Sequence, residues 1–208
     1  MDRINRPEWP VEFARIGRLH GRPVALVADG PGPKLAGRAA ETVREHEKMD
    51  ALVSTGFCGA LAPSLAACDI FVASEVVDVA LALAPSSSLP FQTGKLLSVD
   101  RVVSTALEKA TLGGRADAVE MEAAAVAKCA LQNNLPFYAV RVVTDTYAES
   151  FPLDFNTVRT ATGRFSRTRI LAAALRKPVA VLPELMKLNQ RTKRAAQALG
   201  DFLADARF

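Results

Sequence analysis

The sequence is poor in the residues that carry metal-based and thiol-based chemistry. Its 208 residues include two histidines and three cysteines, and neither type recurs at the spacing of a metal site. Both histidines, His20 and His46, lie in charged stretches, which argues against a zinc centre and against a histidine-based catalytic triad. The three cysteines lie in apolar or turn contexts, so we expect them to be buried free thiols. We therefore expect neither a metal nor an organic cofactor.

Long apolar segments are also missing. No run of eighteen apolar residues occurs, so we expect no segment that spans a membrane. The first ten residues lack the apolar middle part of a signal peptide, which predicts a cytoplasmic protein.

The positive charge is modest and unevenly distributed. The net charge is +4, and basic residues are frequent from Arg164 to Arg194, where Phe165 is the only aromatic residue. This pattern argues against nucleic-acid binding. Leu182–Phe208 has the spacing of an amphipathic helix, whose Lys and Arg residues would form a solvated face. A surface that contacts a lipid substrate is the alternative.

Strand-like and helix-like segments alternate along the chain, half of which is hydrophobic. The predicted strands are Pro23–Ala28, Ala51–Thr55, Asp69–Val77, Asp117–Met121 and Phe137–Thr144; the predicted helices are Leu35–Lys48, Val102–Thr111 and Glu122–Leu131. We expect disorder or a partner contact in the poorly patterned stretch Ala80–Gln92. The alternation predicts a single α/β domain over residues 1–208, a three-layer α/β/α sandwich with a mixed, mostly parallel sheet.

Two acidic positions stand out because each follows a predicted strand. Glu120-Met121-Glu122 leads into an alanine-rich helix, and Asp145 follows the strand Phe137–Thr144. Open α/β sheets bind their ligands at such strand ends. In the first helical turn, the Glu122 carboxylate would gain from the helix dipole and accept hydrogen bonds from sugar hydroxyls or backbone N–H groups. A simple helix cap at Glu122 and an Asx turn at Asp145 are the alternatives.

Several further segments, in order along the chain, resemble the purine nucleoside phosphorylase and nucleosidase superfamily. They are Asp29–Lys34, Val53–Leu61, Asp69–Val76, Glu120–Ala123 and Arg141–Asp145. The resemblance implies a phosphorylase/hydrolase-like fold and cleavage of the N-glycosidic bond of a purine nucleoside. Methylthioadenosine/S-adenosylhomocysteine nucleosidases are among the members that the chain resembles.

A narrower resemblance is to the hopanoid-associated phosphorylases, which are thought to act on adenosylhopane. It depends on Gly94–Val103, Glu108-Lys109 and Phe151–Asn156. This resemblance implies that an adenosyl lipid is a candidate substrate.

The superfamily resemblance also implies roles for individual residues around the base. Asp145 would be the general acid that protonates or hydrogen-bonds N7 of the leaving purine, and Thr144 would orient it. Val102 and Val103 would line the base, at positions where nucleosidases often have an aromatic residue followed by an aliphatic one. The missing aromatic removes base stacking worth about 1 kcal/mol.

A second set of residues would bind the sugar and approach the ligand. Glu122 would hold the ribose 2′- and 3′-hydroxyls, Glu120 would belong to the same sugar-binding segment, and Met121 would pack against the sugar face. Gly59, with Phe57 and Cys58, would bring the backbone close to the ligand.

Two departures from the superfamily pattern bear on the acceptor of the glycosyl group. Ser54 and Phe57 stand where hexameric phosphorylases have an arginine and a serine that hold phosphate. A phosphate dianion would lack those partners, which favours hydrolysis and leaves phosphate as a possible co-substrate.

The second departure is at the N-terminus, where the opening strand and the water-activating glutamate of the nucleosidases are not recognisable. Glu8 and Glu12 are candidates for that glutamate, but Pro7 and Pro10 argue against a central strand there.

Three interpretations stay open at the level of the sequence. The chain is an active glycosyl-bond-cleaving enzyme, a nucleoside-binding protein without turnover, or an N-terminally truncated form of an active enzyme. In each case we expect a small-molecule nucleoside as ligand. We also expect a homo-oligomer, with a dimer favoured, because an uncovered sheet edge invites pairing with another copy.

Overall fold

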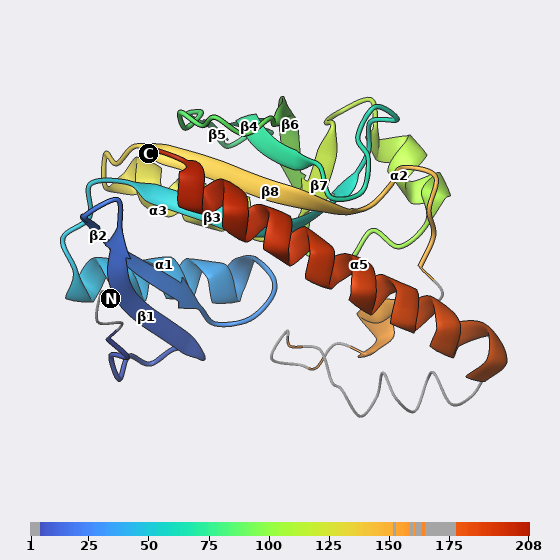
Figure 1. Ribbon diagram of the computed structural model, residues 1–208, viewed down its shortest axis with the longest axis horizontal. Helices are drawn as coiled ribbons and strands as arrows, with labels where there is room; N and C mark the ends of the chain where they lie inside the picture. The colour runs from blue at the N-terminus through green and yellow to red at the C-terminus, as the bar shows by residue number, and fades with distance from the viewer. Residues whose placement is uncertain (1–4, 152, 159, 161–163, 165–177) are drawn as a thin grey trace.

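The computed structural model describes residues 5–151, 153–158, 160, 164 and 178–208, and its centre is a six-stranded mixed sheet (Figure 1). The strands are β3 (Leu52–Ala60), β4 (Ile70–Val76), β5 (Ala80–Leu81), β6 (Gln92–Ser98), β7 (Ala118–Glu120) and β8 (Phe137–Asp145). Their spatial order is β5-β4-β6-β7-β3-β8. The predicted α/β class with a mixed central sheet is confirmed.

The sheet closes on itself, which the sequence did not indicate. β4 pairs with β6 on one side and with β8 on the other, with Phe71 opposite Arg141. Parallel pairs join β3 to β8, β4 to β6 and β6 to β7, whereas β3–β7, β4–β5 and β4–β8 are antiparallel. The parallel registers are the longer ones, above all β3–β8 and β4–β6, so the sheet is mixed and mostly parallel, as predicted. Closure leaves the inward-facing side chains of five strands in one enclosed interior.

Helices cover the sheet on different sides. α1 (Pro33–His46) packs on α3 (Ala123–Gln132), and α3 contacts β3 and β8. α5 (Pro178–Asp205) runs along β8 in Figure 1 and buries Ala195, Leu199 and Phe202 against Val140 and Val142. The predicted amphipathic helix over Leu182–Phe208 is thus present, although residues 165–177 of the basic region lie outside the described residues. No helix in the described part of the chain is long and apolar enough to cross a membrane.

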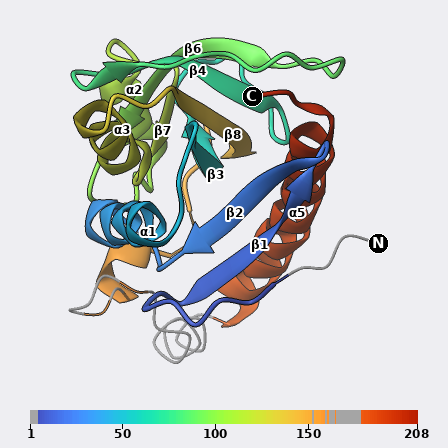
Figure 2. The same ribbon diagram turned by 90° about the vertical axis from the view of Figure 1, so that its left-hand side faces the viewer.

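The N-terminal strands form a sheet of their own. β1 (Phe13–Leu19) and β2 (Arg22–Ala28) make an antiparallel hairpin beside α1, and in the described residues it does not join the six-stranded sheet (Figure 2). The hairpin turns at His20 and Gly21, both with positive φ. Residues 52–58 of β3 pair with β8 only, since β7 reaches no further than Gly59. This open edge is the arrangement expected of a sheet that lacks one strand.

Two boundaries differ from the prediction for identifiable reasons. The helix predicted over Val102–Thr111 is α2 (Ala106–Leu112), because Thr105 and Glu108 form a capping box that fixes the helix start. The strand predicted over Ala51–Thr55 is longer than expected, because β3 continues through Gly56 to Ala60 by pairing with β8. We did not predict β1 or β6, whose alternating patterns are weak.

The stretch Ala80–Gln92 is ordered, contrary to the disorder that we considered. Asp205, at the end of α5, accepts hydrogen bonds from Ser87 Oγ and Ser88 N, both at 2.7 Å. The backbone of Ser86 pairs with that of Arg207. These long-range contacts could not be read from a local pattern.

We predict that the packing of α5 on the sheet contributes substantially to stability. Phe202 is fully buried and meets Phe91 edge to face, with ring centroids 5.7 Å apart. Phe202→Ala should lower the free energy of unfolding by about 3–5 kcal/mol, measured by urea denaturation. Met186→Ala, on the same helix but 71% exposed, is the matched control and should be nearly neutral. Similar values for both variants would show that α5 does not depend on this packing.

Candidate active site

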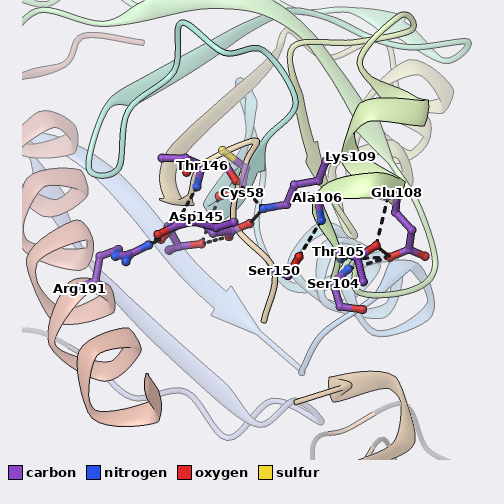
Figure 3. A network of polar contacts seen from close by, with 12 residues as sticks. Cys58, Ser104, Thr105, Ala106, Glu108, Lys109, Asp145, Thr146, Ser150 and Arg191 are labelled. Atoms are coloured by element: carbon purple, nitrogen blue, oxygen red, sulfur yellow. Dashed lines mark hydrogen bonds and ion pairs between the residues drawn. The ribbon is translucent and has the colours of Figure 1, made fainter. Parts of the chain in front are cut away.

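Asp145 lies at the end of β8 beside Gly59 of β3, and three neighbours fix its carboxylate. Thr144 Oγ1 donates to Asp145 Oδ1 at 2.8 Å, as the predicted orienting role requires. Lys109 Nζ donates to Asp145 Oδ2 at 2.5 Å (Figure 3). The third neighbour is Gly59, where a Cβ atom would lie 2.8 Å from Oδ2. Gly59 therefore leaves room for the carboxylate of Asp145, a reason for glycine that the sequence did not reveal.

Lys109 is the residue of this site that sequence reasoning missed. It lies in the last turn of α2, is 1% exposed, and donates a second hydrogen bond to Thr146 O at 2.7 Å. Figure 3 shows Asp145 between Lys109 from α2 and Arg191 from α5. Arg191 donates to Glu149 Oε2 at 2.7 Å, so its charge has a partner of its own. The only sequence signal for Lys109 was its place in the narrower family resemblance.

Glu120 is engaged in contacts within the protein. Both of its oxygens accept hydrogen bonds: from Ser98 Oγ, from Arg141 Nη2 at 2.6 Å, and from the backbone N–H groups of Glu122 and Ala123. Burial alone would raise the pKa of Glu120, but the charge and hydrogen bond of Arg141 hold it below its ordinary value. We predicted a substrate-binding role for Glu120; its geometry instead fits a buried cap at the start of α3.

Glu122 has a different environment from Glu120. It occupies the N-cap position of α3, but its side chain makes no capping bond. Its Oε1 instead accepts from Gly32 N at 2.7 Å, in the glycine turn between β2 and α1. Burial, and then the negative charge of Glu120, raise the pKa of Glu122. The plain helix cap that we considered is thus carried by Glu120, which leaves Glu122 free for the predicted role on the sugar.

β7 and β8 are not neighbouring strands, but the ends that carry Glu120 and Asp145 lie at the same level of β3, where Gly59 pairs with both Val119 and Asp145. β3 separates β7 from β8, and β7 runs antiparallel to β3. Cys58 of β3 lies between them, and the charges of Arg141, Asp145 and Glu120 all act on the pKa of its thiol. Burial raises the pKa of this thiol, so Cys58 is an uncharged lining residue.

The remaining predicted residues lie in varied surroundings. Val103 is buried in a core cluster with Leu61 and Leu97, so its side chain supports the site from the core. Val102 is held by Asn156, which bonds its N–H and C=O at 2.8 and 2.9 Å. Met121 is partly buried, and Phe57 is 42% exposed.

The candidates for a water-activating glutamate lie on the surface. Glu8 is exposed, and Glu12 forms an ion pair with Arg164. The backbone of Glu12 donates to the buried Asp29, which also binds Arg38, so Glu12 stays close to the glycine turn that contacts Glu122. The role of either glutamate stays a prediction. The described residues contain no group of His, Cys, Asp and Glu side chains that could hold a metal ion.

This fold has counterparts among known structures. A family profile for the phosphorylase superfamily matches residues 4–84 and 75–176. The 5′-methylthioadenosine/S-adenosylhomocysteine nucleosidase of Neisseria meningitidis, solved with methylthio-immucillin-A, is 20% identical with a TM-score of 0.69, covering 99% of this chain and 89% of that one.

Two further structures extend this similarity. The nucleosidase of the same name from Colwellia psychrerythraea, solved with adenine, is 26% identical with a TM-score of 0.59, covering 69% of this chain and 74% of its own. A futalosine hydrolase mutant from Helicobacter pylori is 19% identical with a TM-score of 0.61, covering 72% and 80%. The fold is that of the nucleoside phosphorylases and nucleosidases, a class of glycosyl-bond-cleaving enzymes. The chain belongs to the phosphorylase superfamily, as the extent of the profile match shows.

We predict that a side chain at position 59 disturbs Asp145. A methyl group at Gly59 would contact Oδ2 and push the carboxylate away from Lys109. Gly59→Ala should therefore lower the free energy of unfolding by about 1–3 kcal/mol, measured by urea denaturation. Gly114→Ala is the control, because a Cβ there meets nothing within 4 Å. Equal stability of both variants would contradict the close approach.

We also predict that Glu122 reduces stability at neutral pH. Because its pKa is raised in the folded chain, its contribution to stability is full below the pKa of the unfolded chain and is lost as the pH rises through the folded pKa. Glu122→Gln keeps an acceptor for Gly32 N and should be more stable than the wild type at neutral pH. The difference should vanish below about pH 4, where glutamate is protonated in both states.

Glu149→Gln is the control for Glu122→Gln, with the opposite sign. Burial raises the pKa of Glu149, but the hydrogen bonds from Arg191 and Thr146 outweigh it and lower the pKa overall. Glu149→Gln should therefore be less stable than the wild type at neutral pH. Urea denaturation across the pH range measures both variants, and a Glu122→Gln variant that is less stable at neutral pH would refute the assignment.

Proposed function

We propose that the protein hydrolyses the N-glycosidic bond of a purine nucleoside, with Asp145 as the general acid. The observation that carries the proposal is the buried carboxylate of Asp145, held by Thr144 and Lys109 at the end of β8. Breaking this bond creates an oxocarbenium-like ribosyl cation and a basic purine anion. A buried carboxyl group next to N7 can neutralise the purine as it leaves.

The sugar would be held on the other side of Cys58 from Asp145. The Glu122 carboxylate can accept bonds from the 2′- and 3′-hydroxyls, and its negative charge favours the ribosyl cation. Met121 offers a polarisable surface to the sugar. Gly32 N donates to Glu122 Oε1 at 2.7 Å and Met121 N donates to Oε2 at 3.3 Å, so Oε2 is the oxygen with the longer bond and the better placed to accept a further one from a hydroxyl.

The contacts of Ser54 favour water over phosphate as the acceptor of the ribosyl group. Its hydroxyl is buried and accepts a hydrogen bond from Arg141 Nη2 at 2.7 Å, so it supports the core. Phe57 offers no hydroxyl at the position of the phosphate-binding serine. No cofactor is needed for this reaction, and phosphate stays a co-substrate to be tested.

Binding of a nucleoside without turnover is the second candidate. The observation in its favour is that both oxygens of Asp145 already accept hydrogen bonds from protein donors. Chromatographic detection of adenine separates the candidates, with adenosine, methylthioadenosine and an adenosylated hopanoid as substrates. Adenine in phosphate-free buffer supports hydrolysis, and adenine only with phosphate supports phosphorolysis. Calorimetric binding of these nucleosides without any adenine supports the second candidate.

We predict that Asp145→Asn lowers kcat for the nucleoside that is cleaved by about 10²–10⁴-fold, the usual contribution of a general acid. The loss should appear in kcat, because the amide keeps the shape of the carboxyl group but cannot transfer its proton. Asp201→Asn, on the exposed side of α5, is the control and should keep full activity. An Asp145→Asn variant with wild-type kcat would disprove the assignment.

A further inference from the structure

Lys109 forms a buried ion pair with Asp145. In the proposed reaction it holds that carboxylate but takes no part in the proton transfer. Its side chain is 1% exposed, and moving an ammonium group out of water is costly unless strong partners compensate. Asp145 Oδ2 and Thr146 O take two of its three N–H groups. The ring of Phe151 lies 5.7 Å from Nζ and gives the charge a third favourable neighbour.

A purely structural clamp would not require a charge at this place. The loop after β8 is already joined to α2 by neutral hydrogen bonds: Phe151 N donates to Ser104 O at 2.8 Å, and Ala106 N donates to Ser150 Oγ at 3.0 Å. Among the described contacts of the Asp145 carboxylate, Lys109 supplies the ammonium group, whereas Thr144 supplies a neutral hydroxyl.

We propose that Lys109 is a positioning residue that aims Asp145 at the leaving purine and supplies the proton that Asp145 passes on. The inference rests on the proposed function and deepens it. A carboxylate cannot act as an acid until it receives a proton, and Lys109 Nζ is the donor in contact with Oδ2. Arg191 is a poor alternative, because guanidinium stays protonated in proteins and this one is paired with Glu149.

The proton transfer balances without any further reactant. As the C–N bond breaks, its electron pair goes to the purine and makes N7 strongly basic. Asp145 starts as a carboxylate: the Nζ–H bond of Lys109 breaks and an O–H bond forms on Asp145. That O–H bond then breaks as the proton passes to N7, so Asp145 ends as a carboxylate again. Lys109 is left as a neutral amine, and it regains a proton from water after the purine departs.

The test compares two substrates that differ in their need for an acid. Adenosine, or whichever purine nucleoside the wild type cleaves, needs its leaving group protonated; 4-nitrophenyl riboside releases a stable phenolate and does not. Lys109→Met should lower kcat for the purine nucleoside by roughly 10²-fold or more. With the nitrophenyl substrate its kcat should change only a few-fold. Lys128→Met, exposed on α3, is the matched control and should behave as the wild type with both substrates.

A double variant guards against misfolding from an unpaired buried carboxylate. In the Asp145→Asn background, Lys109→Met should cause no further loss of kcat, because Lys109 acts through Asp145. Circular dichroism and urea denaturation establish that this neutral pair folds. Equal losses of Lys109→Met on both substrates, or an undiminished rate with the purine nucleoside, would overturn the inference while the proposed function stands.

If the wild type cleaves no nucleoside, a binding measurement still tests the role of Lys109 separately from the proposed function. Calorimetry with adenosine and 7-deazaadenosine, which lacks N7, measures the contact between Asp145 and the base. A wild-type preference for adenosine that Lys109→Met removes would support the inference even though the proposed function fails. If Lys109→Met keeps both the affinity and the preference of the wild type, the inference is wrong. If the wild type binds neither nucleoside, the inference and the proposed function are both wrong.

Discussion

The buried ion pair between Arg141 and Glu120 holds the closed sheet and the candidate site together. Both side chains are 1% exposed, and the Arg141 Nη2 atom lies 2.6 Å from Glu120 Oε2. Ser98 of β6 donates to Glu120, and Arg141 of β8 donates to Ser54 of β3. A single chain of polar contacts thus links β6, β7, β8 and β3. Loss of either charge would leave the other buried without a partner, which typically costs about 3–5 kcal/mol.

This ion pair also explains why two glutamates separated by one residue behave differently. Glu120 points into the interior, where Arg141 and the first N–H groups of α3 stabilise its ionised form. With those N–H groups satisfied, the Glu122 side chain makes no helix cap. The charge of Glu120 then raises the pKa of its neighbour. Glu120 stabilises the corner between β7 and α3. The ionised form of Glu122 is unfavourable at the same corner, and a ligand that donates hydrogen bonds to it can relieve this.

The sequence predicted the parts of the structure that depend on local pattern. The helices that became α1 and α3 follow from periodicity, and Asp145 stands out as an acidic residue at the end of a strand, whereas the role of Thr144 was implied by the family resemblance. The role of Glu120 was not predictable, because a carboxylate between a strand and a helix looks the same in the sequence whether it binds sugar or an arginine twenty-one residues away. Lys109 escaped notice for a related reason: only the approach of α2 to the end of β8 brings its ammonium group to Asp145. Closure of the sheet depends on the pairing of β4 with β8, which no local signal specifies.

The N-terminal hairpin stands outside the six-stranded sheet, and it is nevertheless coupled to the site. β2 leads into the glycine turn at residues 30–33, and Gly32 N in that turn donates to Glu122 Oε1. Gly30 and Gly32 both have positive φ, which lets the backbone enter α1 while Gly32 N–H points at the carboxylate. A shift of the hairpin would therefore alter the electrostatic environment of the residue proposed to hold the ribose. Because the hairpin pairs with no strand of the six-stranded sheet in the described residues, such a shift would break no strand pairing between them. The geometry of the sugar site thus depends on how firmly α1 and the glycine turn hold the hairpin in place.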